Sequence, residues 1–252
     1  MVHFVGAGPG AEDLITVRGL KLVKNADIII YAGSLVNKEI LNNAKEGSSV
    51  YDSAKMNLDE VIDVISKGSL QCKDIVRLHT GDPCIYGAIR EQMDRLDELG
   101  IEYDYTPGVS SFCGAAAALR AEYTLPSVSQ SIIITRQAGR TPVPDRESIR
   151  SFAAHGATMV IFLSAGMTDK VQEELIAGGY SENTPAAIVY KATWPDEKVL
   201  RCSVGTLNKT AIENGVKNLA LLCVGDFLGN DYELSKLYDK SFTTGYRQGT
   251  DI

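Results

Sequence analysis

The chain has 252 residues, a net charge of −7, 44% hydrophobic residues and 23% charged residues. This length allows one large domain or two of about 125 residues, and either arrangement buries a sizeable core. The acidic balance disfavours nonspecific binding to nucleic acid, which needs clustered Lys and Arg. No apolar run approaches the roughly 18 residues of a membrane helix and no leader precedes the first predicted strand, so we expect a soluble, cytoplasmic protein.

The cysteines and histidines are scattered without the spacing of a disulfide framework or a zinc site. The five cysteines stand at 72, 84, 113, 202 and 223, and the three histidines at 3, 79 and 155. Since no C-x-x-C pair occurs, we expect reduced thiols and no metal.

In the first half of the chain, apolar β-branched runs alternate with segments of helical period, as in a largely parallel sheet with crossover helices. The runs predict strands at 2–5, 27–31, 48–51, 74–79 and 101–105. Helices are expected over about 14–26, 57–67 and 86–99. Asp13 is the predicted cap of the first helix, whose inner face consists of Leu14, Val17, Leu20 and Val23. Asn57 and Glu60 form a predicted capping box at the start of the second helix. Gly100 is the predicted stop of the third helix.

The second half repeats the alternation after an aperiodic segment, 119–131, that contains Pro126 and is our candidate linker. Strands are predicted at 131–135, 157–163, 185–190, 197–203 and 219–225. The segment between 190 and 197 is too short for a helical crossover, so its flanking strands should form an antiparallel hairpin. We therefore expect two α/β domains, 1–125 with a mostly parallel five-stranded sheet and 126–252 with a mixed five-stranded sheet, and an active site in the cleft between them.

The first loop, in "HFVGAGPGAEDLITVRG" at 3–19, suggests a nucleotide-type ligand because Gly6, Gly8 and Ala11 satisfy G-x-G-x-x-G/A. A dinucleotide site needs free amides facing a pyrophosphate and an acid after the second strand. Pro9 lacks an amide, Glu12 and Asp13 place negative charge nearby, and the second strand ends "YAGS" without an acid. A pyrophosphate would bind poorly here; a purely structural turn remains an alternative.

Two further loops share this character: "HTGDPCIYG" at 79–87 and "TPGVSSFCGAAAA" at 106–118 each follow a predicted strand. Three small-residue loops at one sheet edge form a floor suited to a flat, uncharged ligand such as an adenosyl group. Each loop taken singly is also compatible with ordinary turn chemistry.

Together these motifs resemble the tetrapyrrole (corrin/porphyrin) methyltransferases, from Val2 to about Arg247. The resemblance is carried by "VGAGPGAEDLITVRG", "GDPCIYG", "PGVSS" and "TRQAGRTP", which occur in this order. Within the family, "ADIIIYAGSLV" and "FTTGYR" are most similar to the enzymes that methylate carbon 11 of precorrin-4 or cobalt-precorrin-4, giving the corresponding precorrin-5, in cobalamin biosynthesis.

The resemblance implies S-adenosylmethionine as methyl donor, released as S-adenosylhomocysteine and bound mostly through backbone groups. The implied contacts are Pro9, Thr80, Gly81, Asp82, Ile85, Ser110, Ser111, Leu163 and Ala192. Family members often have alanine where Ser111 stands, a departure that a backbone contact tolerates. For Leu163 and Ala192, simple packing is the alternative.

The implied substrate is a macrocycle rimmed with carboxylates, which requires basic groups at the site despite the chain's net charge of −7. Arg136 and Arg140 in "TRQAGRTP" are the first candidates, and Lys191 and Arg201 come next. Solvated surface side chains are the alternative for each of them.

Methyl transfer from a sulfonium needs alignment and exclusion of water rather than a nucleophilic residue. We accordingly interpret Cys84 as a small hydrophobic residue and Asp82 as a group that fixes its loop and contacts the donor; no catalytic base is assigned. Tyr31 and Tyr86 either stack on the macrocycle or close the core.

Three other functions remain open: a nicotinamide-dependent oxidoreductase, a noncatalytic tetrapyrrole carrier, and a sister methyltransferase acting at another ring carbon, for example on uroporphyrinogen III or another precorrin. The family also implies a homodimer, with no membrane or nucleic-acid partner. Whether the substrate carries cobalt is not encoded in these motifs.

Overall fold

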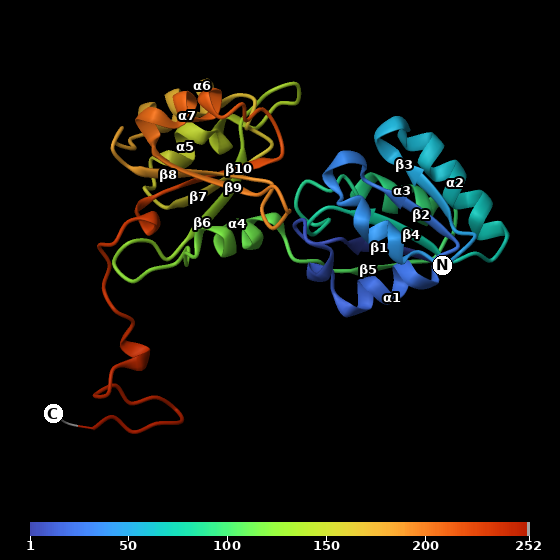
Figure 1. Ribbon diagram of the computed structural model, residues 1–252, viewed down its shortest axis with the longest axis horizontal. Coiled ribbons are helices and arrows are strands. Elements are labelled where there is room, and N and C mark those ends of the chain that lie inside the picture. The colour runs from blue at the N-terminus through green and yellow to red at the C-terminus, as the bar shows by residue number, and fades with distance from the viewer. Residues whose placement is uncertain (251–252) are drawn as a thin grey trace. The chain divides into compact units, whose positions relative to one another are not determined.

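The computed structural model describes residues 1–250, apart from the side chain of Ser34, and divides into two compact units. The first comprises Met1–Ala117 with Lys191–Glu197, and the second comprises Ala118–Tyr190 with the chain from Lys198 onward (Figure 1). The division thus falls after Ala117, whereas the expected domains meet between 125 and 126, and the hairpin loop 191–197 belongs to the first unit.

The first unit contains a five-stranded, wholly parallel sheet in the order β3-β2-β4-β1-β5. Its strands are β1 (Val2–Gly6), β2 (Ile28–Tyr31), β3 (Ser49–Asp52), β4 (Ile75–His79) and β5 (Tyr103–Thr106). Every residue of β1, β2 and β4 is buried, so apolar residues predominate in these strands instead of alternating with polar ones, and His3, Arg77 and His79 are buried among them. All five predicted strands of this sheet are confirmed.

Four helices belong to or begin in this part of the chain: α1 (Val17–Asn25), α2 (Leu58–Leu70), α3 (Arg90–Glu98) and α4 (Ser111–Leu119). Val23 of α1 packs with one face of the sheet, whereas α2 and α3 pack with the other through Ile62, Ile65 and Leu96. The capping box at the start of α2 is confirmed, with Asn57 Oδ1 accepting from the Glu60 amide at 2.9 Å and Glu60 Oε2 accepting from the Asn57 amide at 2.8 Å.

The prediction for the first helix is wrong at its start. Thr16, not Asp13, is the N-cap and accepts from the Gly19 amide, because residues Glu12–Leu14 form a separate 3-10 turn. Val17 is 72% exposed, so it does not belong to the buried face. That face is built on Gly19 and Val23, since a Cβ at Gly19 would lie only 3.0 Å from Val5 Cγ1 and the glycine lets α1 approach β1.

The third helix begins at Arg90, later than the predicted residue 86. The intervening turn places Tyr86 at φ +57° and Ala88 at φ +49°, conformations that a right-handed helix does not contain. The predicted stop is confirmed by Gly100, which has φ +63° directly after the helix.

The second unit contains the mixed five-stranded sheet expected for it, in the order β6-β7-β10-β8-β9. Its strands are β6 (Ile132–Arg136), β7 (Thr158–Phe162), β8 (Pro185–Tyr190), β9 (Lys198–Ser203) and β10 (Ala220–Val224). Only β6 and β7 pair in parallel, and β8 and β9 form the predicted antiparallel hairpin. The core on one face is shared with α5 (Ile149–Ala153), α6 (Thr168–Ala177) and α7 (Leu207–Glu213).

The segment expected as a linker, 119–131, is irregular but is anchored in the second unit. Tyr123 is buried, its ring centroid lies 5.1 Å from that of Phe227, and its carbonyl accepts from Thr158 Oγ1 at 2.9 Å. Short 3-10 segments complete the secondary structure at Glu12–Leu14, Gly33–Leu35, Lys38–Asn43, Ser53–Lys55, Asp145–Glu147, Val204–Thr206, Asp226–Leu228 and Lys236–Tyr238.

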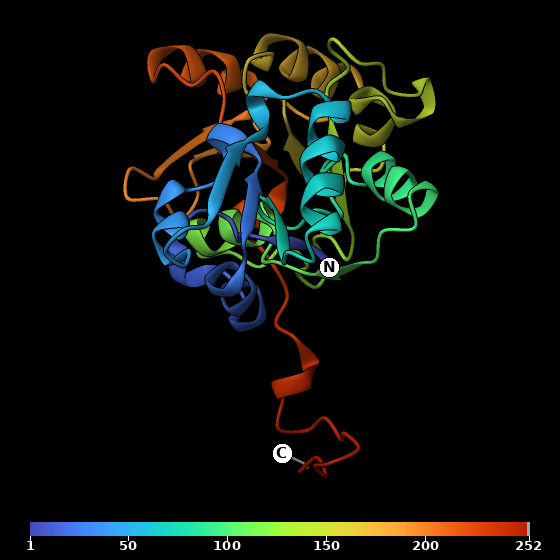
Figure 2. The same cartoon turned by 90° about the vertical axis from the view of Figure 1, so that its right-hand side faces the viewer.

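The C-terminal segment runs outward from the second unit in both views (Figures 1 and 2). Arg247, from the motif "FTTGYR", organises it by donating from Nη2 to the carbonyls of Leu237, Asp239 and Phe242. Across residues 1–250, no helix combines the length and apolar character needed to cross a membrane.

Two buried polar side chains lie on the central strand β4. Arg77 donates from Nε to Gln92 Oε1 at 3.0 Å and from Nη1 to the Ile30 carbonyl at 3.1 Å, and burial lowers its pKa to about 10. The His79 ring stacks on Phe4 with centroids 6.2 Å apart, and its buried Nε2 has no hydrogen-bond partner among the residues described. Burial, with a smaller contribution from the charge of Arg77, lowers the pKa of His79 to about 3.

His79 should therefore make stability depend on pH below neutrality. Its pKa rises from about 3 in the folded chain to 6.5 in the unfolded chain, so the unfolded state binds more protons and stability falls as pH drops below 6.5. Urea unfolding between pH 7 and pH 5 should show a weaker decline for His79→Leu, by up to about 1.4 kcal/mol per pH unit. The exposed His155 provides the control variant His155→Gln, and equal declines in wild type and His79→Leu would contradict this account.

Candidate functional site

Three glycines bring the loops after β1, β4 and β5 into backbone contact. A Cβ at Gly6 would lie 2.6 Å from Gly108 Cα and 2.6 Å from the Gly81 carbonyl oxygen, and a Cβ at Gly108 would lie 2.2 Å from that same oxygen. Real Cβ atoms do not approach backbone this closely, so a side chain at either position would push the loops apart. The three small-residue loops thus meet through their backbones at the carboxyl edge of the sheet.

Three backbone amides of the first loop are already bound by the protein. Ala7 N donates to the His79 carbonyl at 2.7 Å, Gly8 N to the Gly81 carbonyl at 3.2 Å, and Ala11 N to Thr193 Oγ1 at 3.0 Å. Pro9 has no amide hydrogen. A pyrophosphate needs several free amides at this position, so the geometry argues against the dinucleotide alternative and favours an uncharged ligand surface.

Asp82 ties the second loop to the third. Its Oδ1 accepts from the Cys84 amide at 2.8 Å and from the Tyr105 hydroxyl, and its Oδ2 accepts from the Gly108 amide at 2.9 Å. Burial raises the pKa of Asp82, but these hydrogen bonds outweigh burial and leave the pKa below its usual value. Asp82 is therefore an ionised, committed acceptor that fixes the loop, and it is poorly suited to serve as a base.

Cys84 lies beside this carboxylate. Burial and the neighbouring Asp82 raise the pKa of the Cys84 thiol, so the thiol stays protonated and is a poor nucleophile. We predicted Cys84 to be a small hydrophobic residue beside the site, and its side chain is exposed.

Of the nine predicted donor contacts, eight lie in the first unit. Thr80, Gly81, Asp82 and Ile85 follow β4, Ser110 and Ser111 stand at the start of α4, Pro9 follows β1, and Ala192 lies in the hairpin loop. Contacts link them: a Cβ at Gly81 would lie 3.2 Å from Ser111 Oγ, and a Cβ at Gly114 would lie 2.7 Å from Pro9 Cβ and 3.5 Å from Ala192 Cβ. The structure therefore gathers the loops that carry these residues at one sheet edge.

The ninth predicted contact, Leu163, lies in the second unit with the two predicted substrate arginines. It directly follows β7, has φ +53° and is 59% exposed. A bulky residue in the left-handed region is strained, and strain of this kind concentrates at functional sites. The neighbouring strand β6 ends at Arg136, and the next amide, Gln137 N, donates to Ser164 Oγ at 2.8 Å.

The two predicted arginines differ in their surroundings. Arg136 donates to the carbonyls of Gln137, Thr141 and Pro142 at 3.4, 3.2 and 2.7 Å, so its guanidinium closes its own loop. Arg140, at the exposed tip of that loop, makes no hydrogen bond or ion pair with any of residues 1–250. Arg140 is thus the available cation of the pair.

The second-choice basic residues both have partners within the fold. Lys191 Nζ lies 2.6 Å from Asp196 Oδ2 and 5.2 Å from the centroid of the Trp194 ring. Arg201 donates to the carbonyls of Leu119 and Leu228. Of the two tyrosines, Tyr31 is 6% exposed and closes the core, whereas Tyr86 is 44% exposed.

Sequence reasoning missed four residues that shape this edge. Asn37, Tyr105, Thr193 and Trp194 each donate to or accept from one of the glycine loops. Trp194 could have been suspected because it is the one tryptophan of the chain. The others have no local signal, since their partners are distant in sequence.

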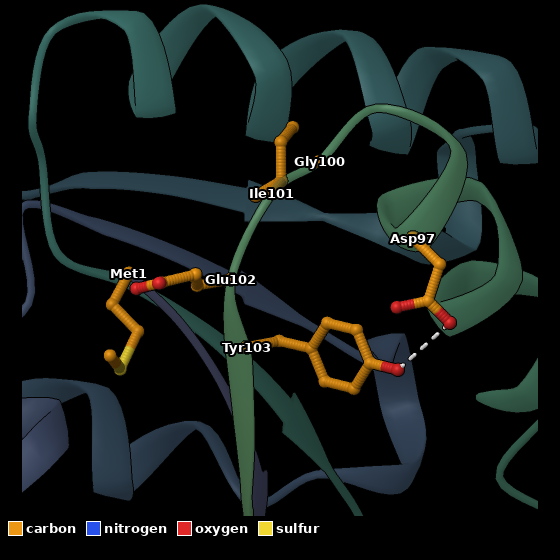
Figure 3. Close-up of a pocket in the computed structure, with 6 residues that line it drawn as sticks. All are labelled: Met1, Asp97, Gly100, Ile101, Glu102 and Tyr103. Carbon is orange, nitrogen blue, oxygen red and sulfur yellow. Dashed lines mark hydrogen bonds between the residues drawn. The ribbon is translucent and has the colours of Figure 1, made fainter.

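A pocket elsewhere on the first unit contains none of the predicted site residues (Figure 3). Its lining residues are Met1, Asp97, Gly100, Ile101, Glu102 and Tyr103, which lie where β1 and β5 begin, whereas the glycine loops lie where those strands end. It contains two carboxylates, and the Tyr103 hydroxyl donates to Asp97 at 3.2 Å. No group of three or more His, Cys, Asp or Glu in the described part of the chain is placed to hold a metal ion.

Comparison with known proteins agrees with this geometry. The model of the Tetrapyrrole (Corrin/Porphyrin) Methylases matches residues 1–208. A cobalt-precorrin-4 C(11)-methyltransferase from Methanocaldococcus jannaschii is 52% identical over 98% of this chain and 96% of its own length. The X-ray structure of a cobalt precorrin-4 methyltransferase has 44% identity and a TM-score of 0.89, over 91% of this chain and 96% of its own.

A more distant structure, a uroporphyrin-III C-methyltransferase from Thermus thermophilus complexed with S-adenyl homocysteine, has 24% identity and a TM-score of 0.75 over 90% of this chain and 92% of its own, and shows the shared fold. The chain has the fold of a methylase. Its two α/β units, its sheet edge with close glycine contacts and these matches all agree on this class. The chain belongs to the tetrapyrrole (corrin/porphyrin) methylase family.

Asp82→Asn should destabilise the chain because asparagine cannot accept from three donors at once. We expect a loss of about 1–2 kcal/mol in the free energy of unfolding at pH 7, reduced from the value for a fully buried ion by partial exposure. The pKa of Asp82 in the folded chain lies below 3.8, so this contribution is complete above 3.8 and is lost as pH falls further. Urea unfolding at pH 7 and pH 3 measures the difference.

Asp94→Asn is the matched control, since Asp94 pairs with Arg90 on an exposed helix face where an ion pair contributes little. A gap between wild type and Asp82→Asn that stays constant down to pH 3, or that Asp94→Asn reproduces, would contradict the role assigned to Asp82.

Proposed function

We propose that the chain is an S-adenosylmethionine-dependent C-methyltransferase that methylates carbon 11 of precorrin-4 or cobalt-precorrin-4, giving the corresponding precorrin-5 in cobalamin biosynthesis. The names of its relatives support this assignment. The structural observation that carries it is the sheet edge at which Gly6, Gly81 and Gly108 meet and at which the amides of Ala7, Gly8 and Ala11 are bound within the protein.

The residues at this edge fit an adenosyl donor. Gly81 packs closely against Ser111, and Pro9 and Ala192 are uncharged residues whose Cβ atoms lie near Gly114. We propose Pro9, Thr80, Gly81, Asp82, Ile85, Ser110, Ser111, Leu163 and Ala192 as donor contacts. When bound, S-adenosylmethionine supplies an activated methyl group on a sulfonium.

The chain's own task is then to orient donor and macrocycle and to exclude water. Alignment of two reactants can lower a barrier by roughly 7–11 kcal/mol. Asp82 holds the second loop in place, and Cys84 is left as a protonated thiol without a covalent role. We assign no general base, because the electron-rich ring carbon of the macrocycle is itself the nucleophile.

We propose that Arg140 binds a carboxylate of the macrocycle and that Arg136 holds the loop that presents it. Arg140 is exposed and makes no hydrogen bond or ion pair with the described residues, while Arg136 donates to three loop carbonyls. A guanidinium suits a carboxylate because its planar fork allows two parallel hydrogen bonds.

Arg140→Gln should raise the KM for the macrocycle about tenfold or more, because a charge-assisted pair is lost, and should leave the KM for the methyl donor unchanged. Steady-state kinetics with each reactant varied in turn would measure both. Arg146→Gln is the matched control, since Arg146 is an exposed arginine of the same segment that pairs with Glu147. An equal effect of both variants, or a rise confined to the donor's KM, would refute the assignment.

The position of methylation has a direct test. The protein is incubated with methyl-labelled S-adenosylmethionine and precorrin-4, with and without cobalt, and carbon NMR locates the label. We expect label at carbon 11, and the form turned over faster identifies the preferred substrate. Label at another carbon, or turnover of uroporphyrinogen III alone, would establish the sister methyltransferase instead. A protein that binds macrocycle but never transfers label would be a carrier.

We also infer a homodimer working in the cytoplasm, by analogy with the family. Sedimentation velocity of the purified chain tests the dimer, and a single species of about monomer mass would exclude it.

A further inference from the structure

The loop between β8 and β9, residues 191–197, is packed against the first glycine loop. Trp194 Nε1 donates to the Pro9 carbonyl at 3.2 Å, and Thr193 Oγ1 accepts from the Ala11 amide at 3.0 Å. A Cβ at Gly10 would lie 2.0 Å from Trp194 Cδ1 and 2.7 Å from the Ala192 carbonyl oxygen. Glycine at position 10 is therefore required by the indole and the backbone of the hairpin loop.

A second segment of the chain also binds the backbone of Pro9, Gly10 and Ala11. Asn37, which is 7% exposed, donates from Nδ2 to the Gly10 carbonyl at 2.9 Å. The Pro9 carbonyl and the Ala11 amide are thus bound by adjacent side chains of the hairpin loop, and the Gly10 carbonyl is bound by Asn37. This arrangement fixes the backbone of residues 9–11 in one conformation.

The hairpin loop is itself braced in an unusual conformation. Lys191 and Thr193 have φ +47° and +68°, which is costly for residues with a Cβ. Glu197 compensates by accepting from the Thr193 amide at 2.6 Å, and Lys191 pairs with Asp196 at 2.6 Å. Residues with φ > 0 are common in hairpin connections, and in this loop the braced conformation places Thr193 and Trp194 against the first loop.

We propose that Thr193 and Trp194 are positioning residues of the donor site, and that the loop 191–197 sets the place of the Pro9–Ala11 backbone against which the donor binds. This inference rests on the proposed function, because it takes Pro9 and Ala192 as donor contacts. Ala192 is buried, with 6% exposure, and is adjacent to Thr193, while Trp194 binds the Pro9 carbonyl. A change at Thr193 or Trp194 therefore affects the positions of two proposed donor contacts, Pro9 and Ala192. Neither residue needs to contact the donor itself.

Two pairs of variants test the inference. Thr193→Ala removes the acceptor for the Ala11 amide, and Thr193→Ser retains it at the same backbone conformation. Trp194→Phe keeps an aromatic ring but removes the donor to Pro9, and Trp194→Ala removes both. One lost neutral hydrogen bond corresponds to about a fivefold change in an equilibrium constant.

Two measurements are made on the full chain. Amide hydrogen exchange at Ala11 should become about fivefold faster in Thr193→Ala and stay unchanged in Thr193→Ser. The Kd for S-adenosylhomocysteine, measured by calorimetry, should rise about fivefold in Thr193→Ala and Trp194→Phe, more in Trp194→Ala, and stay at the wild-type value in Thr193→Ser. Thermal unfolding of each variant reports any general loss of stability.

Faster exchange at Ala11 with an unchanged Kd would overturn the inference, since the loop would then be loosened without consequence for the donor. A lower melting temperature with wild-type exchange and Kd would also overturn it and leave only a structural anchor. If the wild-type chain bound no S-adenosylhomocysteine, the proposed function would fail, while exchange at Ala11 would still report whether Thr193 fixes the loop.

Discussion

The contact of Gly6, Gly81 and Gly108 at the carboxyl edge of the parallel sheet is the constraint on which the rest of the structure depends. Three strands that are neighbours in the sheet end in loops that touch through backbone alone, with no room for a Cβ at Gly6 or Gly108. Close approach lets Gly8 and Gly81 exchange amide hydrogen bonds and brings the Gly108 amide to Asp82. The three loops are therefore held together by contacts within the chain itself.

Charge and polarity at this edge follow from the same constraint. Amides at positions 7, 8 and 11 are consumed inside the protein, and the carboxylate of Asp82 is saturated by the Cys84 and Gly108 amides and the Tyr105 hydroxyl. Because these polar groups are bonded within the protein, a ligand at this edge would contact close-packed backbone rather than free charged groups. Such an edge suits a nucleoside without a pyrophosphate. Under the proposed function, the positive charge for an anionic macrocycle comes from side chains such as Arg140, because the chain as a whole carries −7.

The sequence was sufficient to predict the strands and the small-residue loops, but not the contacts between those loops. Apolar, β-branched and aromatic residues identified all ten strands, because strands are rich in these residues whether they are wholly buried, as β2 and β10 are, or only partly buried, as β5 and β9 are. The cap of the first helix was misassigned because Asp13 and Thr16 are both good caps, and only the 3-10 turn at Glu12–Leu14 decides between them. The roles of Asn37, Tyr105, Thr193 and Trp194 depend on contacts distant in sequence, as does the engagement of Arg136 with its own loop.

The central claim is that this edge binds an adenosyl group and does not bind a dinucleotide, although Gly6, Gly8 and Ala11 satisfy the glycine pattern of a dinucleotide site. Calorimetric titration of the full chain with S-adenosylhomocysteine and, separately, with NAD⁺ tests it most directly. The account predicts saturable binding of S-adenosylhomocysteine, abolished or strongly weakened when a side chain is introduced by Gly108→Ala, and no heat of binding with NAD⁺. Saturable binding of NAD⁺ together with none of S-adenosylhomocysteine would contradict it.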